Sequence, residues 1–232
     1  MDTPNIYLDG TYLKNNPDWN VYEAPLKAKY ILQILEKNGI SASTVCEIGC
    51  GAGEVLNLLS AKYSTAASYC GYEISPEAHA ICKGKERDNL KYFLGDAFGD
   101  DRKYDLVLLL DVLEHVEDYI GFARRVCAKG KYKIVHLPLD LSVQTVTRGS
   151  PMIKYRRKGG HLHYFTRDTA IATLEDAGYS IIDSMYTPIA FELPDVGWKA
   201  NAMNIPRAML YPFWPHFTAR LLGGFSLLVL AE

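Results

Sequence analysis

The sequence predicts an α/β fold: a doubly wound, mostly parallel seven-stranded sheet with helices on both faces. Short β-rich runs alternate with helical segments over residues 44–138. The strand runs are almost continuously apolar, which is typical of a parallel sheet covered on both faces. Such alternation indicates right-handed βαβ units that build one sheet.

Each element of the alternating region has its own signal. Strands are expected where apolar and β-branched residues run together, over residues 44–49, 68–74, 90–94, 104–111 and 131–138. Helices are expected between them, over residues 54–63, 76–87 and 119–130. Strands over residues 179–187 and 224–232 complete the sheet, and the last of them is expected to be antiparallel.

The flanking segments predict further structure. A helix over Pro25–Lys37 is expected to end near Asn38 and Gly39. Residues 142–160 are expected to form a polar loop, and 161–165 ("HLHYF") a short strand. A helix over residues 167–178 follows, with Thr166 as its N-cap.

The predicted domain organisation has three parts. Residues 1–40 form an N-terminal helical lid, with Trp19 and Tyr22 as apolar lid residues or, alternatively, as packing residues. Residues 41–232 form the main domain. An insertion near residues 190–218, rich in proline and aromatics, is expected to cover a substrate or to pack on itself.

Composition narrows the function classes. The chain has 232 residues, 48% hydrophobic and 22% charged, with a formal net charge of −2. No global positive field favours nucleic acid or acidic membranes. Five cysteines without a CxxC pair suit reduced thiols, and the first residues lack a signal-peptide pattern. The longest late apolar run, 221–231, is too short to span a bilayer. These features predict a cytoplasmic protein without a transmembrane segment.

The run "TVCEIGCGAGEV" (44–55) places a carboxylate and three glycines where a strand should become a helix. The spacing is GxGxG, whereas a dinucleotide site has GxGxxG around a pyrophosphate. Glu47 would repel a pyrophosphate but suits a cationic ligand, which argues against a dehydrogenase. Glu73 and Asp96 end the next two strands, where they are placed to accept hydrogen bonds from ribose hydroxyls and an adenine amino group.

These motifs resemble the class I S-adenosylmethionine-dependent methyltransferases. The match runs through "EIGCGAGE", "YEIS", "GDA" and "DVLEHVED", and the later "GGHLHYFTRDTAIATLEDAGYSI" is similar to members related to the ubiquinone O-methyltransferases. The resemblance implies a Rossmann-like fold with S-adenosyl-L-methionine as cofactor. It implies a cofactor site formed by Glu47, Gly49, Cys50, Gly51, Gly53, Glu73, Ile74, Asp96, Ala97, Asp111 and Val112.

Histidines are the expected catalytic residues, because an imidazole titrates near neutral pH. His115 follows the fourth strand, and His161 and His163 alternate along the expected 161–165 strand. Each has a structural alternative, in packing or on a solvated surface. No metal is expected, although one helical turn would group Asp111, Glu114 and His115 as ligands, in an arrangement similar to that of metal-dependent ubiquinone and small-RNA O-methyltransferases.

The acceptor is expected to be an oxygen of a small molecule or glycan precursor. No (D/N)PP(Y/F) motif follows the fourth strand, and its absence argues against the amino group of a nucleobase as the methyl acceptor. The alternatives are methylation of a peptide or protein carboxylate or amine, and a catalytically silent cofactor-binding subunit. The run "KYRRKGG" (154–160) is either a solvated face or, beside a substrate mouth, a site for a carboxylate or phosphate.

Overall fold

The computed structural model describes residues 7, 10–19, 21–63, 68–99, 101–188, 192 and 197–232, the last range without the side chains of 197–201. The expected lid and insertion are therefore described only in part. Residues 1–6, 8, 9 and 20 of the lid lie outside the described residues, as do 190, 191 and 193–196 of the insertion.

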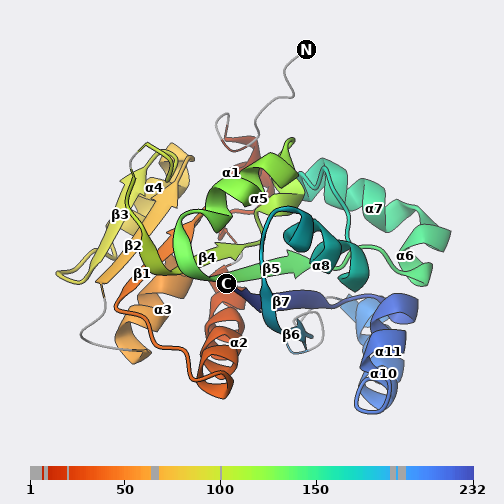
Figure 1. Cartoon of the computed structure of the whole chain (residues 1–232). Coiled ribbons are helices and arrows are strands. Elements are labelled where there is room, and N and C mark those ends of the chain that lie inside the picture. The colour runs from red at the N-terminus through yellow and green to blue at the C-terminus, as the bar shows by residue number, and fades with distance from the viewer. Residues whose placement is uncertain are drawn as a thin grey trace.

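One seven-stranded sheet forms the centre of the molecule (Figure 1), in the order β3-β2-β1-β4-β5-β7-β6. The strands are β1 (Thr44–Ile48), β2 (Ser68–Glu73), β3 (Leu90–Leu94), β4 (Tyr104–Leu110), β5 (Gly130–Pro138), β6 (Ile181–Thr187) and β7 (Ser226–Ala231). The β3-to-β5 ladder is parallel, and β7 runs antiparallel to both β5 and β6. The predicted fold class is confirmed, as are the seven strands expected to form the sheet.

Helices cover both faces of the sheet, as the apolar strand runs require. Side chains from α2 (Ala24–Lys37), α3 (Glu54–Lys62) and α4 (Pro76–Lys83) share one buried apolar cluster with the sheet. Those from α5 (Tyr119–Cys127) and α8 (Arg167–Asp176) share a second cluster on the other face. No helix among the described residues is both long and apolar enough to cross a membrane.

Local caps fix several helix starts. The Thr166 side chain accepts from the backbone N–H of Thr169 in a reciprocal capping box, so the predicted N-cap of α8 is confirmed. Ser75 caps α4 in the same sense, through the backbone N–H of Ala78.

The segment 142–160 corrects the sequence analysis, because it is helical rather than a loop. It forms α6 (Val143–Arg148), α7 (Ser150–Lys154) and the π-helix η3 (Tyr155–Gly159). A capping box at Ser142 starts α6, and a proline at the first turn starts α7. These short helices depend on caps rather than on an apolar stripe, which is why their composition looks like that of a loop.

The expected strand at 161–165 is also wrong. This segment pairs with no strand of the sheet; instead the backbone N–H groups of Leu162 and His163 donate to the Glu114 carbonyl, at 2.7 and 3.1 Å. An extended backbone whose hydrogen bonds go to a turn cannot extend a ladder. The segment therefore crosses the end of β4 and brings two histidines towards the residues that follow it.

The insertion folds into two helices, α10 (Gly197–Leu210) and α11 (Pro215–Leu222), beside the β7 end of the sheet (Figure 1). The remaining short elements are α1 (Thr11–Asn15), η1 (Val21–Glu23) and η2 (Leu113–His115).

The turn between β1 and α3 packs closely against its neighbours at Gly53, which has a φ of 74°. A Cβ there would lie 2.6 Å from Cys82 Cβ and 2.7 Å from the Tyr92 ring. We expect Gly53→Ala to destabilise the fold by about 2–4 kcal/mol, from left-handed strain and overpacking together. Gly39→Ala is the control, because its φ is 64° but no atom lies within 4 Å. Equal midpoints of the two variants in urea unfolding would contradict this packing argument.

Candidate active site

A cavity of about 1160 Å³ opens at the carboxyl ends of β1, β2 and β4. Since β1 lies between β2 and β4, the strand order reverses here, where open α/β sheets bind ligands. The cavity wall includes the turn after β1, the end of β2, the residues that follow β4, and residues 154–162. The described part of the lid supplies Tyr7, Tyr12, Trp19, Tyr22 and Lys27.

The turn after β1 presents backbone rather than side chain to the cavity. The N–H groups of Gly49 and Cys50 donate to the Tyr72 carbonyl, which fixes the turn against β2. Gly51 has a φ of 53°, and a Cβ there would meet only Trp19 Cε3, at 3.8 Å. Gly49 and Gly53 are crowded by protein atoms instead. Of the three glycines, Gly51 is the one that keeps space open for a ligand.

Glu73 closes the far side of this turn. Its carboxylate accepts from the backbone N–H of Gly51 at 2.7 Å and of Ser75 at 2.8 Å. Burial raises its pKa, and these backbone N–H groups counteract that rise. Glu73 lines the cavity beside the exposed Ile74.

Glu47 is a buried carboxylate with an unsatisfied oxygen. Its side chain lines the cavity, and Oε2 has no hydrogen-bond partner among the described residues. Burial raises the pKa of Glu47 to about 8, although the positive charge of Lys27 opposes the rise. An orphaned buried acceptor is costly unless a ligand satisfies it, and a cation does so best.

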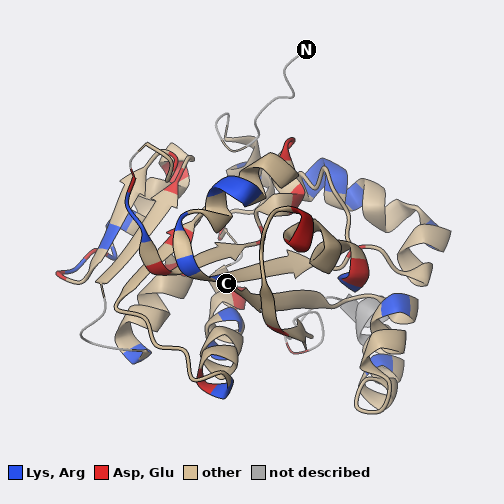
Figure 2. Cartoon of the chain, in the orientation of Figure 1, with Lys and Arg blue, Asp and Glu red and all other residues tan. Residues whose placement is uncertain are grey.

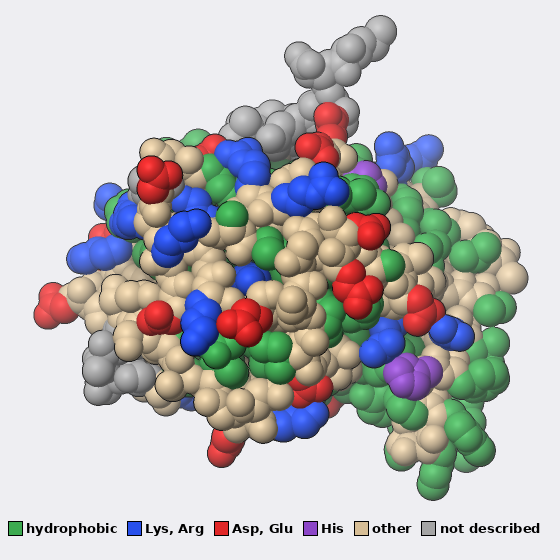
Figure 3. Space-filling view, in the orientation of Figure 1, with side chains coloured by type: hydrophobic (Ala, Val, Ile, Leu, Met, Phe, Trp, Pro, Cys, Tyr) green, Lys and Arg blue, Asp and Glu red, His purple; other side chains and the backbone are tan. Residues whose placement is uncertain are grey.

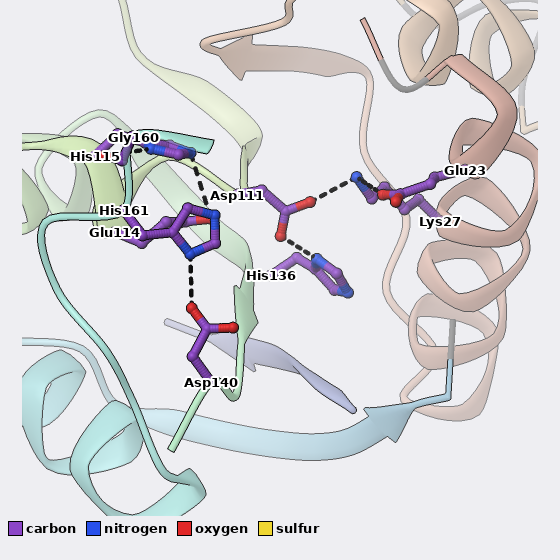
Figure 4. A network of polar contacts seen from close by, with 9 residues as sticks. All are labelled: Glu23, Lys27, Asp111, Glu114, His115, His136, Asp140, Gly160 and His161. Atoms are coloured by element: carbon purple, nitrogen blue, oxygen red, sulfur yellow. Dashed lines mark hydrogen bonds and ion pairs between the residues drawn. The ribbon is translucent and has the colours of Figure 1, made fainter. Parts of the chain in front are cut away.

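Asp111 joins four elements in one polar network (Figure 4). It follows β4 with a φ of 54°. Its carboxylate lies 2.6 Å from His136 Nδ1 on β5 and 2.5 Å from Lys27 Nζ on α2. The other nitrogen of His136 contacts Thr187 Oγ1 on β6, at 2.8 Å. Burial raises the pKa of Asp111, but His136 and Lys27 outweigh it and hold that pKa far below its usual range.

Three further polar side chains meet on the other side of Asp111 (Figure 4). His161 Nδ1 lies 2.6 Å from Asp140 Oδ2, and His115 Nδ1 lies 3.1 Å from the Gly160 carbonyl. Because a carbonyl only accepts, His115 Nδ1 carries the proton and Nε2 is left as an acceptor. Burial and the neighbouring His161 lower the pKa of His115 to about 4, so its ring is neutral at neutral pH. The two imidazole rings pack edge-on, with centroids 5.0 Å apart.

Glu114 lies under these rings. It is 1% exposed, and neither of its carboxyl oxygens has a hydrogen-bond partner among the described residues. Its Oε1 is 3.7 Å from His115 Nε2. Burial and the charge of Asp111 raise its pKa well above the ordinary value.

The alternative metal set is only partly assembled. Asp111 is engaged by Lys27 and His136, so it does not join Glu114 and His115. Instead Glu114, His115 and His161 each offer a ligand atom, all within 4.8 Å of one another. The i, i+3, i+4 spacing fails here because residues 113–115 form a 3₁₀ turn and Asp111 lies outside it.

Several expected site residues lie elsewhere. Asp96 is exposed and accepts from the backbone N–H of Phe98 at 2.9 Å, as a turn former does; neither it nor Ala97 lines the cavity. His163 Nε2 contacts the Val116 carbonyl, and its ring packs on Tyr119, away from the cavity. No described residue of the 190–218 insertion lines the cavity. The other expected cofactor residues line it, with Val112 against Gly49.

Sequence reasoning missed Lys27, His136 and Asp140. Lys27 lies in a helix whose sequence pattern is explained by its apolar face alone, and His136 lies within the strand run 131–138, which carries no functional signal of its own. Asp140 did have a signal, because it is a carboxylate two residues beyond the end of β5, at the same sheet edge as the other acidic residues.

Aromatic side chains from the N-terminal segment cover the cavity. Tyr12 packs between Tyr7 and Trp19, with ring centroids 4.7 and 4.9 Å apart, and Tyr7 contacts the His115 ring edge-on at 5.5 Å. The expectation that Trp19 and Tyr22 border a ligand site agrees with their place in the cavity wall.

Comparison with known proteins identifies a family. A family model described as a methyltransferase domain matches residues 21–184, more than half of the chain. A ubiquinone biosynthesis O-methyltransferase from Nitrosomonas europaea is 32% identical over 102 residues, which cover 40% of this chain. The match spans 41% of that relative, so about two-fifths of its length is represented.

Solved structures share the fold. A methyltransferase from Thiobacillus denitrificans, in complex with S-adenosyl-L-homocysteine, has a TM-score of 0.61 and 14% identity, and the match covers 100% of this chain and 98% of that one. A magnesium protoporphyrin IX methyltransferase from Synechocystis, also with the bound product, has a TM-score of 0.60 and 16% identity, covering 91% and 84%. At these identities the likeness concerns the fold.

Lys27 should contribute more to the free energy of unfolding than an ordinary surface lysine does. Its ammonium contacts both Asp111 and Glu23, and removing it leaves Asp111 buried with one partner fewer. We expect Lys27→Met to lower the free energy of unfolding by about 3 kcal/mol. Lys29→Met is the matched control: Lys29 is half exposed and 3.9 Å from Glu192, so its loss should cost under about 0.5 kcal/mol. Chemical denaturation measures both, and a similar cost for the two variants would refute the network.

Proposed function

The chain belongs to the methyltransferase-domain family. We propose that it is an S-adenosylmethionine-dependent enzyme that methylates an oxygen of a small molecule or glycan precursor. The observation that carries the proposal is the pair of imidazoles at the cavity, His115 and His161, each with Nδ1 engaged and Nε2 left for an acceptor proton. The partial likeness to an enzyme named as an O-methyltransferase points the same way.

The cavity residues fit S-adenosylmethionine. Bound, the cofactor supplies a methyl group on a sulfonium for in-line displacement. The orphaned carboxylate of Glu47 would accept from its ammonium group, and the open backbone at Gly51 would face its amino-acid portion. Glu73 would accept from the ribose hydroxyls, and Ile74 would offer an apolar surface beside them.

Asp140 and His161 supply the proposed general base. The His161 Nδ1–H donates to Asp140, which orients the ring and favours the tautomer with a basic Nε2. His161 Nε2 is the atom that would take the proton of an acceptor hydroxyl held in the cavity. Asp140 stabilises the imidazolium that forms. His115, held neutral by burial, would offer its Nε2 as a second acceptor beside this base.

The aromatic cover over the cavity supports this chemistry. Tyr7, Tyr12 and Trp19 close one side of the space with apolar rings. Excluding water strengthens the polar contacts within and holds acceptor and donor in near-attack geometry.

A divalent metal is the second candidate for activating the acceptor. The observation in its favour is Glu114, whose two buried oxygens find no hydrogen-bond partner in the part of the chain that the structure describes and lie beside two histidines. A mixed carboxylate and imidazole set suits several divalent ions. In this alternative Glu114, His115 and His161 would be ligands, and the metal would lower the acceptor's pKa in place of a protein base.

Glu47 makes the cofactor affinity depend on pH. An unfolded glutamate ionises near 4.5 and the buried one at about 8, so the folded apo state holds an extra proton between these values. That stabilisation is complete below about pH 4.5 and is lost as the pH rises through 8. Binding an ammonium requires ionised Glu47, so affinity for S-adenosylhomocysteine should rise up to tenfold per unit from about pH 6 to pH 8.

Calorimetry over that range tests this claim. Glu47→Gln should bind more weakly at about pH 8 and should lose most of the pH dependence, whereas Glu175→Gln, on an exposed face of α8, should behave as wild type. A wild-type affinity that is flat with pH would show that Glu47 does not meet the ammonium.

One turnover assay distinguishes a protein base from a metal as the group that activates the acceptor. The assay follows the release of S-adenosylhomocysteine with a panel of hydroxyl acceptors. His161→Ala should slow turnover by about 10²–10⁴, with cofactor affinity little changed. Asp140→Asn should slow it less, since it removes only orientation and charge. If a protein base acts, EDTA leaves wild type active; if a metal acts, EDTA inactivates it and a divalent ion restores it.

Near-normal turnover of His161→Ala at saturating cofactor would contradict a role for His161 both as general base and as metal ligand. Turnover only with peptides would favour the protein-methylating alternative. Cofactor binding without turnover on any acceptor would favour a silent subunit.

A further inference from the structure

Large hydrophobic side chains are exposed together on the helices at the β6–β7 end of the molecule. Figure 3 shows hydrophobic side chains gathered over α10 and α11 and along the edge formed by α6. We call this set the apolar surface; its members are 49–74% exposed and are Val143, Val146, Ile153, Ile205, Met209, Phe213, Trp214 and Phe217. Apolar side chains that cluster in the open mark an interaction site.

The apolar surface is a fixed part of the fold. Ile205 and Met209 lie one turn apart on α10, whereas Phe213 lies in the turn that follows it and Phe217 on α11. Arg207 is buried and donates to the Leu222 carbonyl at 2.9 Å. Gln144 of α6 donates to the same carbonyl at 3.3 Å, so α6, α10 and α11 are tied at one point.

Charge is segregated onto the same helices. Residues 142–160 contain five Lys or Arg and no Asp or Glu, and residues 197–222 contain three and none. Since the whole chain carries −2, the two segments carry +8 and the remaining residues −10. Figure 2 shows the basic residues of α7 and the π-helix as neighbouring blue segments of the ribbon. The near-neutral total therefore conceals a basic segment at 142–160, whereas in 197–222 Arg207 is buried and Arg220 is paired with Asp168.

We propose that the apolar surface and its basic neighbours dock this protein onto an anionic phospholipid bilayer. Phenylalanine and tryptophan partition into the headgroup region, and basic residues are attracted to anionic lipids. No acidic residue in either segment opposes that attraction. Asp168 of α8, near α11, is already paired with Arg220. A protein partner would need acidic groups matched to scattered cations, whereas a lipid surface supplies diffuse negative charge.

The docking surface, which we define as the apolar surface together with the basic segment 142–160, borders the cavity. Residues 154–160 belong to the basic segment and also line the cavity wall. If the proposed methyl transfer holds, a lipid-soluble acceptor could pass from the bilayer to the site without crossing water. Docking itself depends on the surface alone and stands independently of the reaction.

Vesicle co-sedimentation of the full chain tests the proposal. Wild type should bind vesicles of phosphatidylcholine mixed with phosphatidylglycerol, bind pure phosphatidylcholine much less, and be released by salt. The double variant Phe213→Ser with Phe217→Ser should bind the mixed vesicles roughly tenfold more weakly or worse. Ile81→Ser is the control, since Ile81 is 41% exposed on α4, outside the docking surface, and should bind as wild type.

A second measurement separates docking from folding and from catalysis. Affinity for S-adenosylhomocysteine should be equal in wild type and the double variant, because no substituted residue lines the cavity. The proposal is overturned if wild type ignores anionic vesicles, or if the double variant binds them as well as wild type does. It is also overturned if the same substitutions instead abolish a dimer seen by sedimentation velocity, which would make the surface a protein interface.

Discussion

The Asp111 carboxylate is the interaction on which the site depends. It sits in a left-handed conformation directly after β4 and binds His136 of β5 and Lys27 of α2 at once. Through His136 it also reaches Thr187 of β6. This one anion therefore links α2 to β5 and fixes the start of the turn that carries Glu114 and His115. Burying such a charge is tolerable only because both oxygens are paired.

The carboxylates around the cavity differ in how far the protein itself satisfies their oxygens. Lys27 and His136 engage the Asp111 carboxylate, which therefore serves the fold. Glu73 is partly satisfied by backbone N–H groups, and Glu47 keeps a buried oxygen without a hydrogen-bond partner among the described residues. Glu47 and Glu114 line the cavity with such oxygens, and this contrast with Asp111 is what favours them as ligand-binding residues.

The sheet could be predicted because its strands are buried on both faces, so apolar runs such as 104–111 mark them directly. The turn after β1 could be predicted equally well, since glycine spacing and strand-end carboxylates are local features. The pairing of His161 with Asp140 was not, because it joins two separate loops beyond β5 that no spacing rule connects. Residues 142–160 were misassigned because capping at Ser142 and Pro151, not hydrophobic periodicity, makes them helical. The total charge likewise concealed the basic segment that these residues form.

The central claim is that the cavity at the ends of β1 and β2 binds the methyl donor, with the donor's amino-acid portion against Gly51. Calorimetric titration of S-adenosylhomocysteine into wild type and Gly51→Arg tests it most directly, with circular dichroism to verify that both are folded. A Cβ at Gly51 meets little protein, so the arginine side chain would enter the cavity rather than disrupt the core. The account predicts measurable binding to wild type and none to the variant. Equal affinity in the two folded proteins would contradict it.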